Sequence, residues 1–221
     1  TLSEIALDLV PAMSKPKYEW TSILRDDARR SYMHHLKNVF TPQQTQRWFD
    51  KAKACAKWER PTKPNGEKMP RSAAWYTRDI DVPYKYSQMT FPAQEFPNWM
   101  NEITSQISQV CGIPDNQMPN SVNLNLYENG RQAVGWHADD EQLFKCDTQD
   151  CLIISLSLGS TRAFDFRLDE RVNDVEMVSN NQGSFYPHSR CYLKNGDLLT
   201  MEGMHQKFYL HRLARYDKVE R

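Results

Sequence analysis

Residues 151–167 read CLIISLSLGSTRAFDFR and hold two runs typical of β-strands, Cys151–Leu158 and Ala163–Arg167, on either side of a glycine-containing turn. Runs of the same kind follow a common pattern of β-branched and aromatic residues: Val122–Tyr127, Cys191–Lys194, Leu198–Met201 and Phe208–His211. Asn195-Gly196 lies between two of them and predicts a hairpin. Several short strands after helical segments predict an α+β chain, with a double-sheet β-sandwich or jelly roll and helices packed outside.

The part of the chain before residue 121 predicts two helices. Thr41-Pro42 is typical of a helix N-terminus, after a short strand-like run at 35–40, and the helix is expected to continue to about Lys57. A second amphipathic helix is expected from Pro97-Asn98 to Gly112. Residues 61–90 are rich in proline, aromatic and basic residues, which favours a loop or hairpin that could form a lid. We expect an N-terminal extension over 1–30 and one domain over 31–221.

Composition favours an intracellular protein without a membrane span. Hydrophobic residues make up 39% of the 221, and no apolar run approaches the length that crosses a bilayer, nor does a leader pattern indicate secretion. The five cysteines are odd in number and lack a CxxC pair, so neither a disulfide framework nor a zinc finger is expected, and a reducing compartment is favoured. We expect a monomer.

The charge is balanced overall but unevenly placed. Residues 1–90 hold 16 Lys and Arg against 10 Asp and Glu, whereas residues 91–221 hold 12 against 18. This asymmetry permits a polyanion to bind the N-terminal half, but it is weaker than the basic surface that would by itself indicate nucleic acid.

His137-Ala138-Asp139 places an imidazole and a carboxylate two residues apart, so that on an extended segment both point to the same side. One more histidine would complete a 2-His-1-carboxylate triad, which leaves open positions on Fe(II). His211 and His205 are the two candidates for this third ligand. His211 ends a β-type run with apolar neighbours and is favoured, His205 lies in a turn, and the remaining possibility is that neither binds metal.

Several motifs in order and spacing resemble the AlkB family of Fe(II)- and 2-oxoglutarate-dependent dioxygenases. The matching residues are Asn125-Leu126-Tyr127, Gly130, His137-Ala138-Asp139-Asp140-Glu141, Ser155-Leu156-Ser157-Leu158-Gly159, Arg162, Phe164, Gly196-Asp197-Leu198-Leu199, Met201-Glu202-Gly203 and His211. The resemblance implies a double-stranded β-helix (jelly-roll) core. It also implies Fe(II) on His137, Asp139 and His211, with 2-oxoglutarate and O₂ as cosubstrates.

The resemblance further implies that Asn125 and Tyr127 bind the carboxylate oxygens of 2-oxoglutarate, and that Glu141 contacts the substrate base. The alternatives are a strand-edge Asn, a core Tyr and a surface Glu. Arg162 could support the substrate or pair with a carboxylate such as Asp165.

Arg71, Trp75 and Tyr76 lie in the expected lid. Aromatic and basic side chains together could stack a flipped base and hold phosphate; the alternative is that Trp75 and Tyr76 pack on the core.

One family feature is not found. Members carry an R-x-N-x-T-x-R strand beyond the second iron histidine, whose arginine pairs with the distal carboxylate of 2-oxoglutarate. The sequence ends ten residues after His211, before such a strand, and we expect that it is truncated there.

The function expected from the resemblance is oxidative demethylation of N-alkylated bases in DNA or RNA, on single-stranded or flipped nucleotides. Two other functions remain open. One is a non-catalytic binding or structural module, for which the absent arginine strand argues. The other is an oxygenase acting on protein or lipid, for which the near-neutral charge argues.

Overall fold

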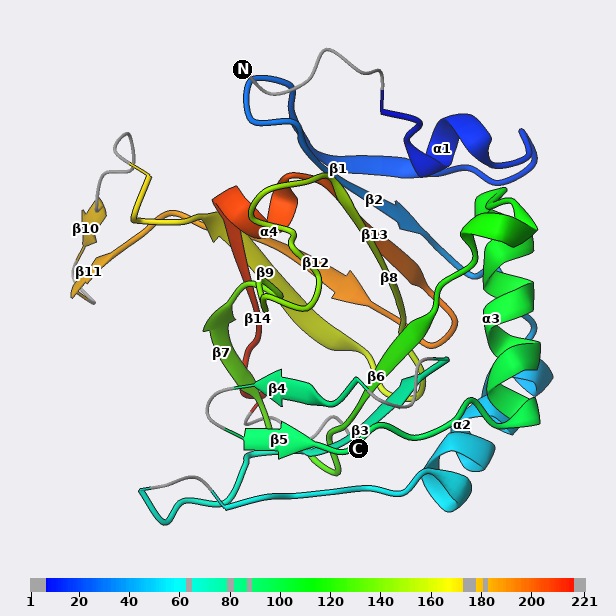
Figure 1. The fold of residues 1–221 in the computed structure, drawn as a ribbon. Coiled ribbons are helices and arrows are strands. Elements are labelled where there is room, and N and C mark those ends of the chain that lie inside the picture. The colour runs from blue at the N-terminus through cyan, green and yellow to red at the C-terminus, as the bar shows by residue number, and fades with distance from the viewer. Residues whose placement is uncertain are drawn as a thin grey trace.

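The fold is described by a computed structural model, which covers residues 7–62, 65–78, 82–86, 89–172, 178–180 and 183–216. Two four-stranded antiparallel sheets dominate it, with the helices at their edge and outer face (Figure 1). One cluster of buried residues, including Met33, Phe166 and Leu199, draws side chains from both sheets, so the sheets pack face to face. This confirms the expected combination of antiparallel sheets and external helices.

The first sheet has the strand order β1-β2-β13-β8. Its strands are β1 (Thr21–Asp26), β2 (Ser31–Leu36), β13 (Leu198–Gly203) and β8 (Cys151–Leu156). Every residue of β13 is buried, because Leu198 faces the helices while Leu199 and Met201 face the second sheet. The polar residues of β13 are buried with partners: Glu202, for example, lies 2.8 Å from the Nδ1 atom of His34 on β2.

The second sheet has the order β12-β9-β14-β7 and carries two of the expected metal ligands. Its strands are β12 (Ser189–Leu193), β9 (Arg162–Leu168), β14 (Tyr209–Leu213) and β7 (Val134–His137). Three two-stranded pairs complete the described strands: β3 (Ser72–Thr77) with β6 (Ser121–Leu126), β4 (Tyr84–Tyr86) with β5 (Met89–Phe91), and β10 (Val178–Asn180) with β11 (Gly183–Phe185). The β4–β5 pair agrees with the hairpin chemistry expected over 61–90.

The two long helices begin and end where the sequence predicts. Helix α2 (Pro42–Cys55) starts with a capping box, in which Thr41 and Gln44 each satisfy the other's backbone N–H. Helix α3 (Asn98–Cys111) ends at Gly112 in the left-handed conformation. The remaining helices are short: α1 (Val10–Met13), the 3₁₀ turn η1 (Asp115–Gln117) and α4 (His205–Phe208). No helix in the described part of the chain is both long enough and apolar enough to cross a membrane.

Residues 7–30, within the expected N-terminal extension, pack on the domain. The backbone N–H of Val10 donates to the buried Glu202 carboxylate at 2.8 Å, and the Ser14 hydroxyl donates to the Val110 carbonyl at 2.6 Å. A Cβ at Gly112 would lie 2.1 Å from the Met13 carbonyl oxygen, so a glycine permits this close approach. The boundary expected after residue 30 therefore lies inside the β1–β2 hairpin.

Two local predictions are wrong. The strand expected over 35–40 is instead β2, because the chain turns at Asn38, which has a positive φ, and Phe40 packs on Trp48 of α2 at 4.7 Å between ring centroids. Asn195-Gly196 does not close a hairpin, since β12 pairs with β9 whereas β13 pairs with β2 and β8. This turn carries the chain from one sheet to the other.

The Asn195-Gly196 turn is held by contacts outside its own strands. The Asn195 side chain donates to the Thr45 hydroxyl at 2.8 Å and accepts the Gly159 N–H at 3.0 Å, while the Gly196 N–H donates to the Ser157 carbonyl at 2.7 Å. The dipeptide predicts a tight turn correctly, but the partners of the flanking strands depend on the sheets.

A disulfide joins Cys146 and Cys151, across the end of the loop that follows β7. The C-x₄-C spacing did not predict this pair. The sulfur atoms of Cys55, Cys111 and Cys191 are free, so the cross-link is a single local one and not a framework.

Candidate metal centre

His137 and His211 are brought together by strand register. His137 is the last residue of β7 and pairs directly with His211 in the middle of β14. Paired residues on neighbouring strands point to the same face, and the two imidazole centroids lie 4.2 Å apart. That face is the inner one, because Phe164 of β9 stacks on the His211 ring at 5.3 Å.

Asp139 completes the set from the segment just after β7. One of its carboxylate oxygens lies 3.9 Å from His137 Nε2 and the other 3.5 Å from His211 Nε2. The three side chains offer ligand atoms within 4.8 Å of one another, and no other such group occurs among the described residues. The structure thus brings together the three ligands that the sequence favoured. The His205 ring lies 6.4 Å from that of His211, and neither of its nitrogens has a hydrogen-bond partner in the described structure.

The protonation states suit a metal. His137 Nδ1 lies 2.8 Å from the Gly135 carbonyl oxygen and donates to it, so Nε2 is the ring nitrogen on the side of Asp139. Burial, and then the neighbouring His137, holds the pKa of His211 well below its usual value, which keeps this imidazole neutral. Burial raises the pKa of Asp139, against the effect of His137 and Arg71, so the carboxylate lacks a compensating cation that a metal would supply. Two imidazoles and one carboxylate on the same side fit Fe(II).

Arg71 and Asn125 form a second layer beside the metal centre. Arg71 immediately precedes β3, Asn125 lies on the paired strand β6, and Arg71 Nε donates to Asn125 Oδ1 at 2.5 Å. Arg71 is 5% exposed and its charge also acts on Asp139. Asn125 is exposed. The lid arginine expected at the substrate therefore lies next to the residue expected to hold 2-oxoglutarate.

Tyr127 and Arg162 lie together on another side. The Arg162 guanidinium stacks on the Tyr127 ring at 5.5 Å and donates to the carbonyls of Gln132 and Ala214, both at 2.8 Å. The alternative pairing of Arg162 with Asp165 is wrong. Asp165 points to the outer face of the sheet and is held by Arg190 and Arg212.

Glu141 is tied to the β4–β5 hairpin. The Tyr84 hydroxyl donates to one of its carboxylate oxygens at 2.7 Å, while the other is buried without a partner in the described structure. Burial, opposed by the Tyr84 hydrogen bond, raises the pKa of Glu141 to about 6. Tyr84 was not predicted as a site residue, although the aromatic residues of the expected lid were a signal for it.

Trp75 and Tyr76 are buried, at 2% and 4% exposure. Trp75 stacks on Tyr84 at 4.9 Å, and the Tyr76 hydroxyl accepts the Lys57 N–H at 3.2 Å. These positions agree with the alternative in which both rings pack on the core. Trp75 then supports Tyr84, which itself contacts Glu141.

A cavity of about 440 Å³ opens beside the metal ligands. Its lining contains one tryptophan, one candidate metal ligand, four acidic residues and one arginine. The lining residues are Trp136, His137, Ala138, Asp140, Glu141, Asp169, Glu170, Arg171 and Leu210. Arg171 is already paired with Asp169. Glu170 is likewise paired with Arg167. Asp140 and Glu141 are therefore the carboxylates through which the cavity favours a cationic ligand.

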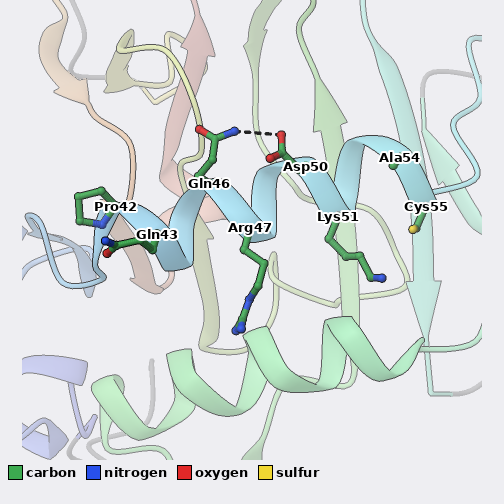
Figure 2. A pocket seen from close by; sticks show the side chains of 8 residues that line it. All are labelled: Pro42, Gln43, Gln46, Arg47, Asp50, Lys51, Ala54 and Cys55. Carbon is green, nitrogen blue, oxygen red and sulfur yellow. Dashed lines mark hydrogen bonds between the residues drawn. The ribbon is translucent and has the colours of Figure 1, made fainter.

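A larger hollow of about 920 Å³ lies elsewhere, along the outer side of α2 next to α3. Figure 2 shows its lining, mostly polar side chains such as Gln46 and Asp50, which hydrogen-bond each other at 2.9 Å. None of the metal ligands lines this hollow. It offers no comparable chemistry.

The model of the 2OG-Fe(II) oxygenase superfamily matches residues 32–220. The chain belongs to this superfamily. Its relatives include the alpha-ketoglutarate-dependent dioxygenase alkB homolog 3 of Bos taurus, 33% identical over 150 residues, and that of Homo sapiens, 32% identical over 150 residues; each match covers 66% of this chain and 46% of the relative. The DNA oxidative demethylase ALKBH2 of Arabidopsis thaliana is 29% identical over 147 residues, covering 61% of this chain and 44% of the relative.

The resemblance to the AlkB family is thereby confirmed, and the chain is an AlkB-type member of the 2OG-Fe(II) oxygenase superfamily. The matches span about half the length of these relatives.

Proposed function

We propose that this protein is an Fe(II)- and 2-oxoglutarate-dependent dioxygenase that removes alkyl groups oxidatively from N-alkylated bases in DNA or RNA. The two sheets then form the jelly-roll core of the oxygenase domain, which we place at residues 31–221. The pairing of His137 with His211, with Asp139 facing both, is the observation that carries the proposal. It supplies three protein ligands on one side and leaves the other side for cosubstrates.

Each group then has a defined task. His137, Asp139 and His211 hold Fe(II), which with 2-oxoglutarate and O₂ supplies the oxidising chemistry at a C–H bond. Asn125 and Tyr127 bind the carboxylates of 2-oxoglutarate, and Arg71 orients Asn125 through its 2.5 Å hydrogen bond. Glu141, Tyr84 and the aromatic residues behind them form the wall that excludes water from the substrate. A hydroxylated N-methyl group would leave as formaldehyde when its C–N bond breaks, with the electron pair of that bond returning to the nitrogen, which restores the unmodified base.

The acidic cavity supports a particular substrate class. Alkylation of a ring nitrogen that normally carries a lone pair makes the base cationic, whereas methylation of an exocyclic amine leaves it neutral. Asp140 and Glu141 beside the metal would attract the cationic form, and Trp136 offers an apolar wall. A base must leave its stack to enter such a cavity, so single-stranded or locally opened nucleic acid is favoured.

The test is formaldehyde release by the full-length protein from single-stranded oligonucleotides. One set carries 1-methyladenine and the other N6-methyladenine, with His211→Ala as the inactive control. We expect faster release from the cationic base. Equal or faster release from the neutral base would refute the preference for a cationic substrate.

The two other functions give different results in the same assay. Turnover of methylated peptides or lipids, without turnover of oligonucleotides, would refute the nucleic-acid substrate and retain the oxygenase. A protein that binds iron and 2-oxoglutarate but releases neither formaldehyde nor succinate would be the non-catalytic module.

A further inference from the structure

Helix α4 places a buried amide directly behind the metal centre. This single helical turn lies between β13 and β14. It carries Gln206, which stands five residues before His211 and is 3% exposed. The Gln206 carbonyl oxygen accepts the backbone N–H of Asp139 at 2.9 Å. Its amide nitrogen contacts the Met201 sulfur on β13 at 3.4 Å. The side chain thus connects the neighbouring elements α4 and β13 to Asp139, which lies 67 residues earlier in the chain.

We infer that Gln206 is a positioning residue for the iron ligand Asp139. The inference rests on the proposed ligand set. Strand β7 ends at His137, so the regular ladder with β14 does not extend to Asp139. The hydrogen bond from Gln206 fixes the backbone at the point from which the carboxylate must reach both histidines. Strand register thereby positions the two histidines, and the Gln206 amide positions Asp139.

The expected effect is on the metal. Hydrogen bonds that orient metal ligands typically change metal affinity by about 10- to 100-fold when they are removed. Loss of the Gln206 oxygen would also leave the Asp139 backbone N–H without its hydrogen-bond partner. The Asp139 backbone would then favour a different position.

The same turn offers a matched control in His205. It precedes Gln206, is 1% exposed and stacks on Tyr209, but neither of its ring nitrogens has a hydrogen-bond partner in the described structure. His205→Phe therefore removes a buried polar side chain from α4 without removing a hydrogen bond to a proposed ligand, and it keeps an aromatic ring beside His211. Gln206→Met keeps the unbranched shape and removes the acceptor oxygen.

The experiment titrates each variant with Co(II) as the metal probe, without cosubstrate, and records affinity, the Co(II) absorption spectrum and the melting temperature. We expect Gln206→Met to bind Co(II) about 10- to 100-fold more weakly, with a changed spectrum, and His205→Phe to match the wild type. If Gln206→Met does not fold, Gln206→Asn, whose amide is one methylene shorter, replaces it.

Wild-type affinity in the Gln206 variant, or an equal loss in the His205 variant, would overturn the inference. So would a wild type that binds no Co(II). Because no oligonucleotide is used, a failure of the proposed substrate class leaves this result unaffected, and the two can be distinguished.

Discussion

At the scale of single residues, the candidate metal centre depends on which side-chain atoms converge on Asp139. His137 donates through Nδ1 to the Gly135 carbonyl, and the Nε2 atoms of both histidines face Asp139. His205 is just as buried as His211, yet its ring lies on Tyr209 and away from the carboxylate. Burial alone therefore does not distinguish a candidate ligand. The distinguishing feature is that the Nε2 atoms of His137 and His211 both lie near the Asp139 carboxylate.

We predict that His211→Ala loses Fe(II) whereas His205→Ala retains it. Removal of a ligand should weaken metal binding by more than the about 10- to 100-fold expected for a supporting hydrogen bond. Metal content and Fe(II) affinity of the purified variants measure this. Loss of iron in the His205 variant alone would show that the third ligand is assigned wrongly.

We predict that Asn125→Ala and Tyr127→Phe each weaken 2-oxoglutarate binding about 10- to 100-fold, since each loses a hydrogen bond to a charged carboxylate. Fe(II) affinity should change little, because neither residue is a metal ligand. Asn123→Ala is the control, as Asn123 is an exposed residue two positions earlier on the same strand. Calorimetric titration of the cosubstrate decides it; unchanged affinity in both variants would leave Tyr127 a packing residue.

Asp165 gives a prediction about stability. Although burial opposes ionisation, hydrogen bonds from Arg190 and Arg212 hold the pKa of this fully buried carboxyl below its usual value. A lowered pKa stabilises the fold above the ordinary value near 3.8, and the contribution is lost as the pH falls through the lowered pKa. Asp165→Asn should cost about 2–3 kcal/mol at neutral pH and much less in acid.

Urea unfolding at pH 7 and in acid tests this prediction. Asp27→Asn is the control, because Asp27 forms an exposed ion pair with Arg25, and such surface pairs contribute little to stability. A deficit in Asp165→Asn that is the same at both pH values would mean that the ionised carboxyl is not responsible.

At the scale of elements, Glu141 in the cavity lining is supported by two pieces of the chain. The loop after β7 supplies Glu141 and Phe144, and the β4–β5 hairpin supplies Tyr84, which contacts both. The loop is closed on itself by the hydrogen bond from the Phe144 N–H to the Glu141 carbonyl at 2.9 Å and by the Cys146–Cys151 disulfide. Its order therefore depends on a covalent bond that reduction can break.

We predict that reduction of this disulfide, or Cys151→Ser, loosens the loop and raises the KM for the base. In the chain-entropy model, a cross-link that closes so short a loop stabilises the folded state by about 2 kcal/mol, because it lowers the conformational entropy of the unfolded chain. Hydrogen exchange of the amides over 141–149 should become faster, with Fe(II) affinity retained. The exposed Cys55 provides the control variant Cys55→Ser. Exchange that is identical with and without reductant would show that packing alone orders the loop.

At the scale of the whole molecule, the uneven charge sets how nucleic acid would be held. The N-terminal 90 residues have an excess of six basic groups and the rest an equal acidic excess. The acidic part includes the cavity that we assign to a cationic base. Phosphates would then be bound by few residues, while the base itself is held by the cavity.

We predict that binding of a methylated single strand weakens only slowly with salt. Three phosphate contacts would give a slope of about −2 in log K against log salt concentration, since each contact on a single strand contributes about −0.7. A fluorescence anisotropy titration at several salt concentrations measures this, and a duplex of the same sequence should bind more weakly. A slope several times steeper would contradict the proposed division of charge.

The sequence by itself determined the local features of this protein. The capping residues and apolar spacing predicted α2 and α3, the β-type runs located β6, β8, β9, β12, β13 and β14 within a few residues, and the H-x-D pair with a later histidine identified the candidate ligands. These features were accessible because helix period, turn chemistry and ligand type are written in residues close together in the chain.

Only the tertiary structure decided the contacts between distant segments. His137 and His211 are 74 residues apart, and their pairing depends on how β14 fits between β7 and β9. The same holds for Tyr84 on Glu141, Arg71 on Asn125, Gln206 on Asp139 and the change of sheet at Asn195-Gly196. Strand partners and buried polar contacts are selected by the packing of two whole sheets, because each is stable only when the groups around it are in place.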